Sequence, residues 1–212
     1  MRTSLTQLEN HKFINQANVT TEEFLDQNIP FILQLVTAYL AQSEHITITD
    51  KLMELLLQDL MHTTFKVNNI QNERMEAARS IKAIGYSPQL WRVLNLDENF
   101  SIQKITREVS RYFGLSEAAA WSMIWPNWAR SIYRKQLDRF ILFAENIMIV
   151  DSCENEEAIA LKGIHAMENF FKILRLPTNF EESGIFPTDD ELEQLSERTE
   201  VPGCLLVLKC SR

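Results

Sequence analysis

Three polar residues of the stretch QKITREVSRYFGLSE, residues 103–117, have types and spacing that suit a binding site. Gln103 and Arg107 are four residues apart, which is one turn of a helix, and Glu117 follows a break that contains a glycine. A carboxylate is a ligand for a hard cation, an amide oxygen is a weaker neutral donor, and a guanidinium attracts anions. The stretch is therefore either the wall of a site or a polar helix face turned towards water.

An aromatic stripe follows directly. Trp121, Trp125 and Trp128 stand at i, i+4 and i+7, so they share one helix face, which Met123 and Ile124 broaden. This face would suit a flat apolar ligand, but aromatic stripes at this period are more often buried in a core. We expect core packing.

Paired carboxylates suggest acid/base chemistry. They are Glu22 with Glu23, Asp189 with Asp190, and the run ENEE at 154–157. Each group stands at the start of an expected helix, where the helix dipole and the free N–H groups favour negative charge. We interpret them as helix N-termini and not as catalytic pairs.

The residues that most often bind metals are scattered. No two of the four histidines have the i, i+4 spacing of a shared metal site, and no CxxC pair is present. The residues concerned are His11, His45, His62, His165, Cys153, Cys204 and Cys210. No HExxH, GxSxG, Walker, EF-hand or GxGxxG motif is present either, so no metal, cofactor or nucleophile site is predicted from motifs.

Bulk properties exclude several further classes. The net charge is −8 and the basic residues are dispersed, which argues against a nucleic-acid partner. No segment has the apolar length of a membrane span, and the N-terminus lacks the apolar core of a signal peptide. We expect a cytoplasmic protein with reduced cysteines.

We expect helices to position the residues named above. Few glycines and prolines and a helical periodicity predict an all-α chain of eight to ten helices. Capping signals at Thr20, Ser116 and Thr188 should start helices, Gly114 should end one, and Gly85 should be a left-handed helix stop. We expect one domain over residues 1–199 and leave the tail, 200–212, unassigned. Pro30 should restart the first helix with Asn28 as a new cap, Pro126 should kink or divide another, and 134–150 should form one helix.

The segment NFFKILRLPTNFEESGI, residues 169–185, resembles the pattern FFxxLGLPTxLxExGI of iron-containing (group III) alcohol dehydrogenases, in the butanol dehydrogenase-like branch. NERMEAARSIKAIG, REVSRYFGLSEAAAWSMIWPNWA and RFILFAENI are similar to other helices of that family, in the same order. FINQANVTTEEFLDQNIPFILQLVTAYL resembles the segment that opens its C-terminal domain. The resemblance covers about residues 12–198 and implies a multi-helix bundle like that C-terminal, dehydroquinate synthase-like domain.

The same resemblance implies where metal ligands would stand. The family's DxxxH pair corresponds to Pro30 and Gln34, and its HxxxHxxxxxxxxxH pattern corresponds to Gln103, Arg107 and Glu117. Only Glu117 is a strong ligand for a hard cation, so we expect no metal. The family's N-terminal dinucleotide domain has no counterpart here, so we expect no nicotinamide cofactor.

These replacements suggest a substitute for the metal. Arg107 would bring a fixed positive charge into the site, and Glu117 would pair with it, because an unpaired buried charge is costly. Trp121 would line or fill the emptied cleft together with the rest of the stripe.

We therefore expect a non-catalytic, degenerate relative of that domain, a pseudoenzyme with an interaction or regulatory role. Two alternatives remain open. One is the metal- and substrate-binding chain of a two-chain NAD(P)-dependent alcohol dehydrogenase, and the other is a small-molecule binding protein that uses the former cleft. A homodimer or another protein partner would cover surface that packs against the nucleotide domain in the family.

Overall fold

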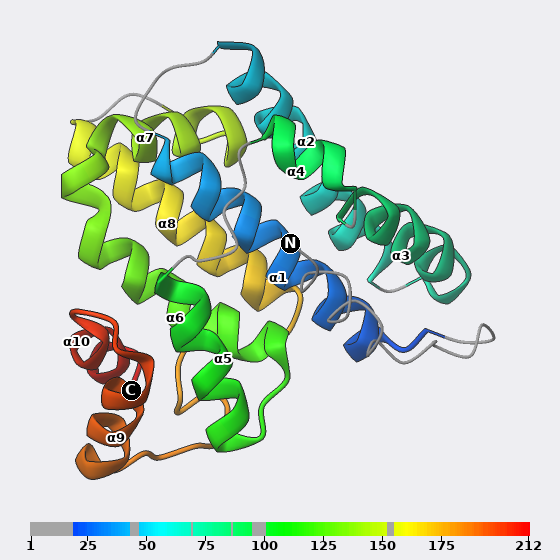
Figure 1. Cartoon of the computed structure of the whole chain (residues 1–212). Helices are drawn as coiled ribbons and strands as arrows, with labels where there is room; N and C mark the ends of the chain where they lie inside the picture. The colour runs from blue at the N-terminus through cyan, green and yellow to red at the C-terminus, as the bar shows by residue number, and fades with distance from the viewer. Residues whose placement is uncertain (1–18, 43–46, 69, 86, 95–100, 152–154) are drawn as a thin grey trace, which may run out of the picture.

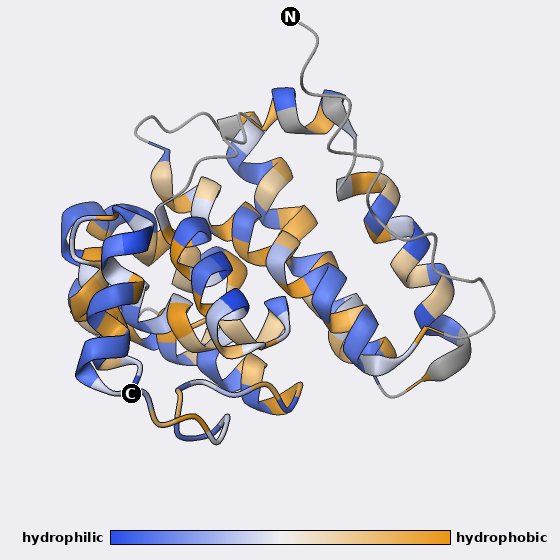
Figure 2. Cartoon of the chain, turned by 60° about the horizontal axis from the view of Figure 1, so that its bottom comes forward, coloured by the Kyte–Doolittle hydropathy of each residue, from blue (hydrophilic) through white to orange (hydrophobic). Residues whose placement is uncertain are grey.

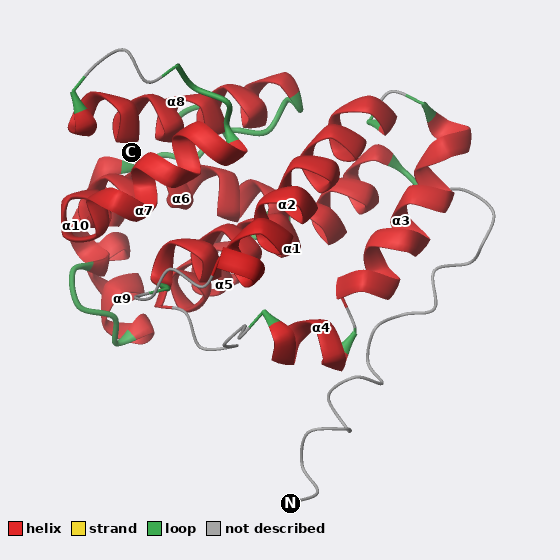
Figure 3. Ribbon diagram, turned by 90° about the horizontal axis from the view of Figure 1, so that it is seen from above, coloured by secondary structure: helices red, strands yellow, loops and turns green. Residues whose placement is uncertain are grey.

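All regular structure in the described residues is helical (Figure 3). The structure is a computed structural model that describes residues 19–42, 47–68, 70–85, 87–94, 101–151 and 155–212 (Figure 1). In chain order its elements are α1 (Thr21–Ala41), α2 (Thr47–Val67), α3 (Gln71–Gly85), α4 (Pro88–Val93), α5 (Ser101–Phe113), α6 (Glu117–Ile132), η2 (Tyr133–Gln136), α7 (Leu137–Leu142), η3 (Phe143–Ile147), α8 (Glu156–Ile173), α9 (Asp189–Thr199) and α10 (Cys204–Cys210). The all-α prediction is confirmed.

Helix α6 is at the centre of the packing. It contacts α1, α5, α8 and α10, while α1 also packs against α2 and α3 (Figure 1). Trp125 is fully buried, with its ring centroid 5.9 Å from that of Phe143 and 6.5 Å from that of Phe171. Hydrophobic and hydrophilic positions alternate around most helices (Figure 2), as amphipathic helices around a shared core require.

Pro30 does not restart the first helix. It lies inside α1, which runs unbroken from Thr20, whose capping box with Glu23 is confirmed. Asn28 is not a cap: its side chain is fully buried, and neither polar atom has a hydrogen-bond partner in the described residues. From Asn28 to Leu40 every residue of α1 except Gln34 is buried, and we attribute the continuity of the helix to this packing, which offsets the hydrogen bond lost at proline.

Two further expectations concern helix breaks. Helix α6 continues through Pro126, so it is not divided there. The single helix expected over 134–150 is instead a 3₁₀ turn, α7 and a π-helical turn, Phe143–Ile147. Helix α8 lies very close to that turn. A Cβ atom added to Gly163 would lie only 2.6 Å from the Cβ of Ala144. Tertiary packing of this kind has no signature in local periodicity.

The segment 169–185 forms the end of α8 and the turn after it. Arg175 has a left-handed backbone, with φ 61°, at the position where the family pattern has glycine. The Glu182 carboxylate accepts bonds from the backbone N–H and the hydroxyl of Thr178, at 2.7 and 2.9 Å. These bonds lower the pKa of Glu182, the backbone bond most. The motif thus encodes a helix stop and a folded turn.

The tail left unassigned is helical. Cys204–Cys210 forms α10, which packs against α9 and α6. The backbone N–H of Phe180 donates to the Ser211 carbonyl at 2.8 Å, which ties the tail to the turn after α8. Residues 204–212 are therefore part of the packed structure.

Candidate functional site

Five of the sequence-predicted site positions meet at one small hollow. Helices α1 and α5 both pack against α6, and side chains from all three line it. The lining residues are Gln34, Gln103, Thr106, Arg107, Glu117 and Trp121. Thr106 was not anticipated, because it matches no ligand position of the family. The hollow has a volume of about 20 Å³, which is room for about one water molecule.

Pro30 is the predicted position that does not line the hollow. It is buried in α1, one turn before Gln34, and so lies on the same side of that helix. Its ring offers no donor atom, so the place that corresponds to the family's aspartate is apolar.

Polar atoms in the hollow are incompletely paired. The Gln103 Oε1 atom is buried and has no hydrogen-bond partner in the described residues. The Thr106 hydroxyl donates to the backbone carbonyl of Gln103 at 3.2 Å and is thereby occupied. One water molecule in the hollow would satisfy the Gln103 oxygen.

The expected ion pair between Arg107 and Glu117 is not formed. Both residues are exposed, and no ion pair within 4.0 Å joins these two described side chains. The expectation assumed that both charges are buried. At the exposed rim water solvates each charge, so little free energy favours holding two long side chains together.

The residues present do not fit a catalytic metal. The hollow offers one carboxylate and two amides, and a guanidinium beside them opposes a cation. Within the described ranges, no three His, Cys, Asp or Glu side chains come together as a ligand group.

The tryptophan stripe is confirmed as core. Trp125 is fully buried, and Trp121 and Trp128 are 2% and 9% exposed. Trp121 alone also lines the hollow, so the stripe closes the site from the core side and leaves no slot for a flat ligand.

The other chemical candidates from the sequence are dispersed. His62 and His165 are exposed, and His165 contacts Glu168 on its own helix, at 3.3 Å. His11, His45 and Cys153 lie outside the described residues. Burial raises the pKa of the Cys204 thiol, which makes it a poor nucleophile. The acidic groups do occupy the first turns of α1, α8 and α9, as predicted.

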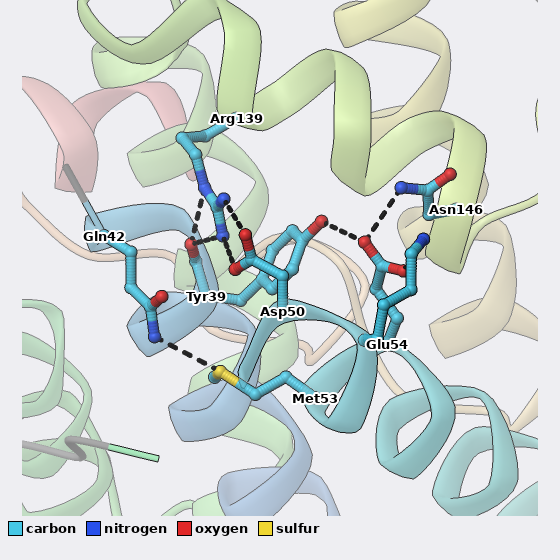
Figure 4. A network of polar contacts seen from close by, with 8 residues as sticks. Tyr39, Gln42, Asp50, Met53, Glu54, Arg139 and Asn146 are labelled. Atoms are coloured by element: carbon cyan, nitrogen blue, oxygen red, sulfur yellow. Dashed lines mark hydrogen bonds and ion pairs between the residues drawn. The ribbon is translucent and has the colours of Figure 1, made fainter. Parts of the chain in front are cut away.

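Sequence reasoning missed a buried polar network at the end of α1 (Figure 4). Arg139 of α7 donates to both carboxylate oxygens of Asp50, at 2.9 and 3.1 Å, and twice to the Tyr39 carbonyl. Its guanidinium carbon also lies 4.1 Å from the centroid of the Tyr39 ring. Carbonyls in the last turn of a helix lack partners within the helix, and Arg139 supplies one here.

A second half of the network centres on Glu54 of α2. Its carboxylate accepts bonds from the Tyr39 hydroxyl and the Asn146 amide, both at 2.8 Å (Figure 4). It also accepts a bond from the Lys51 ammonium at 2.6 Å. Burial by itself would raise the pKa of Glu54, but these three hydrogen bonds and the Lys51 charge outweigh it and hold the pKa below its ordinary value. The network joins α1, α2, α7 and η3, so it fixes helices and not a substrate.

Solved structures with the same fold include proteins named as dehydrogenases or as an aldehyde reductase. NADH-dependent butanol dehydrogenase A of Thermotoga maritima matches with a TM-score of 0.75 and 17% identity, over 91% of this chain and 53% of that one. YqhD of Escherichia coli matches with a TM-score of 0.80 and 13% identity, over 92% of this chain and 53% of that one. An alcohol dehydrogenase of Oenococcus oeni matches with a TM-score of 0.74 and 10% identity, over 92% of this chain and 52% of that one.

One curated sequence also aligns with the chain. NADH-dependent butanol dehydrogenase A of Clostridium acetobutylicum is 24% identical over 106 residues, which is 50% of this chain and 27% of that protein. No protein-family model matches the sequence. This chain thus spans about half the length of the solved structures that it matches, and among its described helices none is long and apolar enough to cross a membrane.

Proposed function

We propose that this chain is a non-catalytic relative of iron-containing alcohol dehydrogenases. It shares the fold of about half the length of the butanol dehydrogenase-type structures that it matches. One observation carries the proposal. The positions that correspond to the family's histidine ligands do gather at one place, from α1, α5 and α6, but the donors found there are two amides and one carboxylate beside a guanidinium. The place of the site is retained, and the ligands have been exchanged.

Restoring a ligand set tests this account of the hollow. The variant Gln34→His/Gln103→His/Arg107→Ala keeps Glu117 and so creates two histidines and a glutamate, a known zinc ligand set, while it removes the opposing cation. We expect it to bind Zn²⁺ at least tenfold more tightly than Arg107→Ala alone in calorimetric titrations. If the restored variant folds but binds zinc no better than this control, the three positions do not converge and the proposal fails.

The two alternatives have less support. A two-chain dehydrogenase would need a metal, and the donor set is unsuited to one. A small-molecule binding protein that uses the former cleft would need more room than about 20 Å³. Calorimetric titration of the wild-type chain with Zn²⁺ separates the two-chain alternative, which needs a metal on this chain, from the proposal, and we expect no saturable binding at the hollow.

An interaction role has support on α2. Ile48, Leu52 and Leu55 stand at i, i+4 and i+7 and are 84%, 39% and 66% exposed, so they form an apolar stripe on the outside of that helix. We propose that a second copy of the chain covers this stripe. Light scattering at micromolar concentrations should show a dimer that Leu55→Lys dissociates, and a monomeric wild-type protein would contradict self-association.

A further inference from the structure

The outer side of α2 carries two opposite charges, placed symmetrically around Leu55 of the apolar stripe. Lys51 stands four residues before Leu55 and Asp59 stands four residues after it, and residues with this spacing form one row on a helix surface. The side chain of Lys51 is 65% exposed, and Leu55 and Asp59 are exposed as well. The row therefore presents a cation, an apolar residue and an anion to the solvent, in that order.

Both charges of this row are available to a partner outside the chain. Asp59 forms no ion pair within 4.0 Å with any of the described residues. The Lys51 ammonium bonds to the Glu54 carboxylate at 2.6 Å, but an ammonium has three N–H donors, and this side chain stays largely in contact with water.

The neighbouring row of the same helix is apolar. Ile48 and Leu52 are also four residues apart, and both are exposed. Removing them and Leu55 from water would stabilise a contact with another apolar surface. The charges of the row beside them would decide which partner fits and in which direction it lies.

We propose that the second copy lies antiparallel across α2, with the two-fold axis of the dimer at Leu55. This inference rests on the proposed function, in which a second copy covers the stripe, and adds the orientation and the residues that select it. Because Lys51 and Asp59 are equally far from Leu55, Lys51 of each copy then faces Asp59 of the partner subunit. A two-fold axis repeats every contact, so the dimer has two such ion pairs.

The same row disfavours a parallel dimer. A parallel pairing of α2 sets Lys51 beside the partner's Lys51 and Asp59 beside the partner's Asp59, and like charges repel each other. The antiparallel pairing is also compatible with ordinary helix packing. When rows of residues spaced by four interdigitate, which is the commonest class of helix contact, the two rows run side by side in opposite directions.

Charge-reversed variants test the orientation, because two of them can be mixed. Lys51→Glu has only acids at the two charged positions and Asp59→Lys has only bases, so each alone should self-associate about tenfold more weakly than the wild type. An equimolar mixture of the two should form the dimer again, since each acid then faces a base. The double variant Lys51→Glu/Asp59→Lys should dimerise like the wild type. Size-exclusion chromatography with light scattering at micromolar concentrations measures the mass of each sample.

The control is Glu197→Lys, which reverses an exposed charge on α9. That helix lies at the opposite end of the molecule from α2 (Figure 1), so this variant should dimerise like the wild type. A loss of the dimer in this control as well would show that net charge, and not the row on α2, governs association, and would refute the inference.

The outcomes separate the inference from the proposal on which it rests. A monomeric wild-type protein would overturn both. A wild-type dimer that Leu55→Lys dissociates, but whose two single charge variants dimerise normally or do not pair when mixed, would keep the second copy and refute the antiparallel register.

A second pair of variants covers a loss of folding in Lys51→Glu, which also removes the contact with Glu54. Circular dichroism shows whether that variant folds. If it does not, Asp59→Lys and Asp59→Asn give the test, because reversing the charge should weaken the dimer more than neutralising it. Dimers as stable as the wild type in both Asp59 variants would refute the inference.

Discussion

Arg139 and Asp50 form a two-pronged ion pair with N–O distances of 2.9 and 3.1 Å, and their side chains are 7% and 9% exposed. The two residues are 89 positions apart, on α7 and α2. The same guanidinium donates to the Tyr39 carbonyl, so one side chain joins three helices. We infer that this contact keeps α2 on the rest of the bundle.

Removing Arg139 should be strongly destabilising. Arg139→Met leaves the Asp50 carboxylate buried without its partner, and we expect a loss of about 3–5 kcal/mol in the free energy of unfolding. Arg139→Met/Asp50→Leu should lose less than the single variant, because the unpaired charge is gone. Urea unfolding measures the free energy of unfolding of both variants.

The control Arg134→Met breaks an exposed ion pair with Glu157 and should hardly shift the urea midpoint. Equal midpoints for Arg139→Met and the control would show that the buried pair does not stabilise the fold.

Two residues with left-handed backbone should be improved by glycine. Arg175 has φ 61° and the β-branched, exposed Ile149 has φ 54°. Arg175→Gly and Ile149→Gly should each raise the free energy of unfolding by about 1 kcal/mol, since glycine adopts this conformation without strain. Ile173→Gly, at an exposed helical position, should instead lower it by about 0.5–1 kcal/mol. A loss of stability in all three variants would contradict the assigned backbone conformations.

Gly163 should tolerate no side chain. A Cβ there would lie 2.6 Å from the Ala144 Cβ and 2.9 Å from its Cα, so Gly163→Ala must push α8 and the π-helical turn apart. We expect a loss of about 1–3 kcal/mol in thermal or urea unfolding. Gly85→Ala is the matched control: its Cβ would meet the Phe31 ring at an ordinary 3.5 Å, and the helix should gain up to about 1 kcal/mol.

Glu54 should make stability depend on acid pH. Its pKa is held below the ordinary value of 4.5 in the folded protein, so its contribution is present above that value and is lost as the pH falls through the folded-state pKa. Glu54→Gln should therefore destabilise the protein clearly at pH 7 and much less at pH 3. Denaturant unfolding at both values tests this, with the exposed Glu76→Gln as control. If Glu54→Gln lowers the free energy of unfolding by the same amount at pH 7 and pH 3, the charge of Glu54 does not contribute to stability.

Local signals in the sequence predicted local structure well. The capping boxes at Thr20 and Thr188 and the Ser116 cap all form, and α5 ends just before Gly114 as predicted. Gly85, expected as a left-handed helix stop, is instead the last residue of α3 and has no left-handed backbone. Prediction failed where tertiary packing decides, as at Pro30, whose helix continues because the bundle buries it. The role of Arg139 was equally hidden, since a single arginine in a helix gives no sign of a partner far away in the sequence.

The site was predicted by resemblance and not by periodicity. Gln34, Gln103 and Glu117 meet in space because the fold brings α1, α5 and α6 together, and only the family register connected these three positions beforehand. The ion pair of Arg107 with Glu117 was predicted wrongly, because a register gives neighbouring positions but not the exposure of their side chains.

The metal content of the purified wild-type protein tests the central claim most directly. Protein prepared without chelator or affinity metal should be analysed for iron, zinc and manganese per chain. If the family's metal ligands have been replaced, as we propose, the protein should contain far less than one ion of iron, zinc or manganese per chain. A content near one iron, zinc or manganese per chain, retained after dialysis and lost in Glu117→Ala, would show that the hollow between α1, α5 and α6 still holds a metal and would contradict the account.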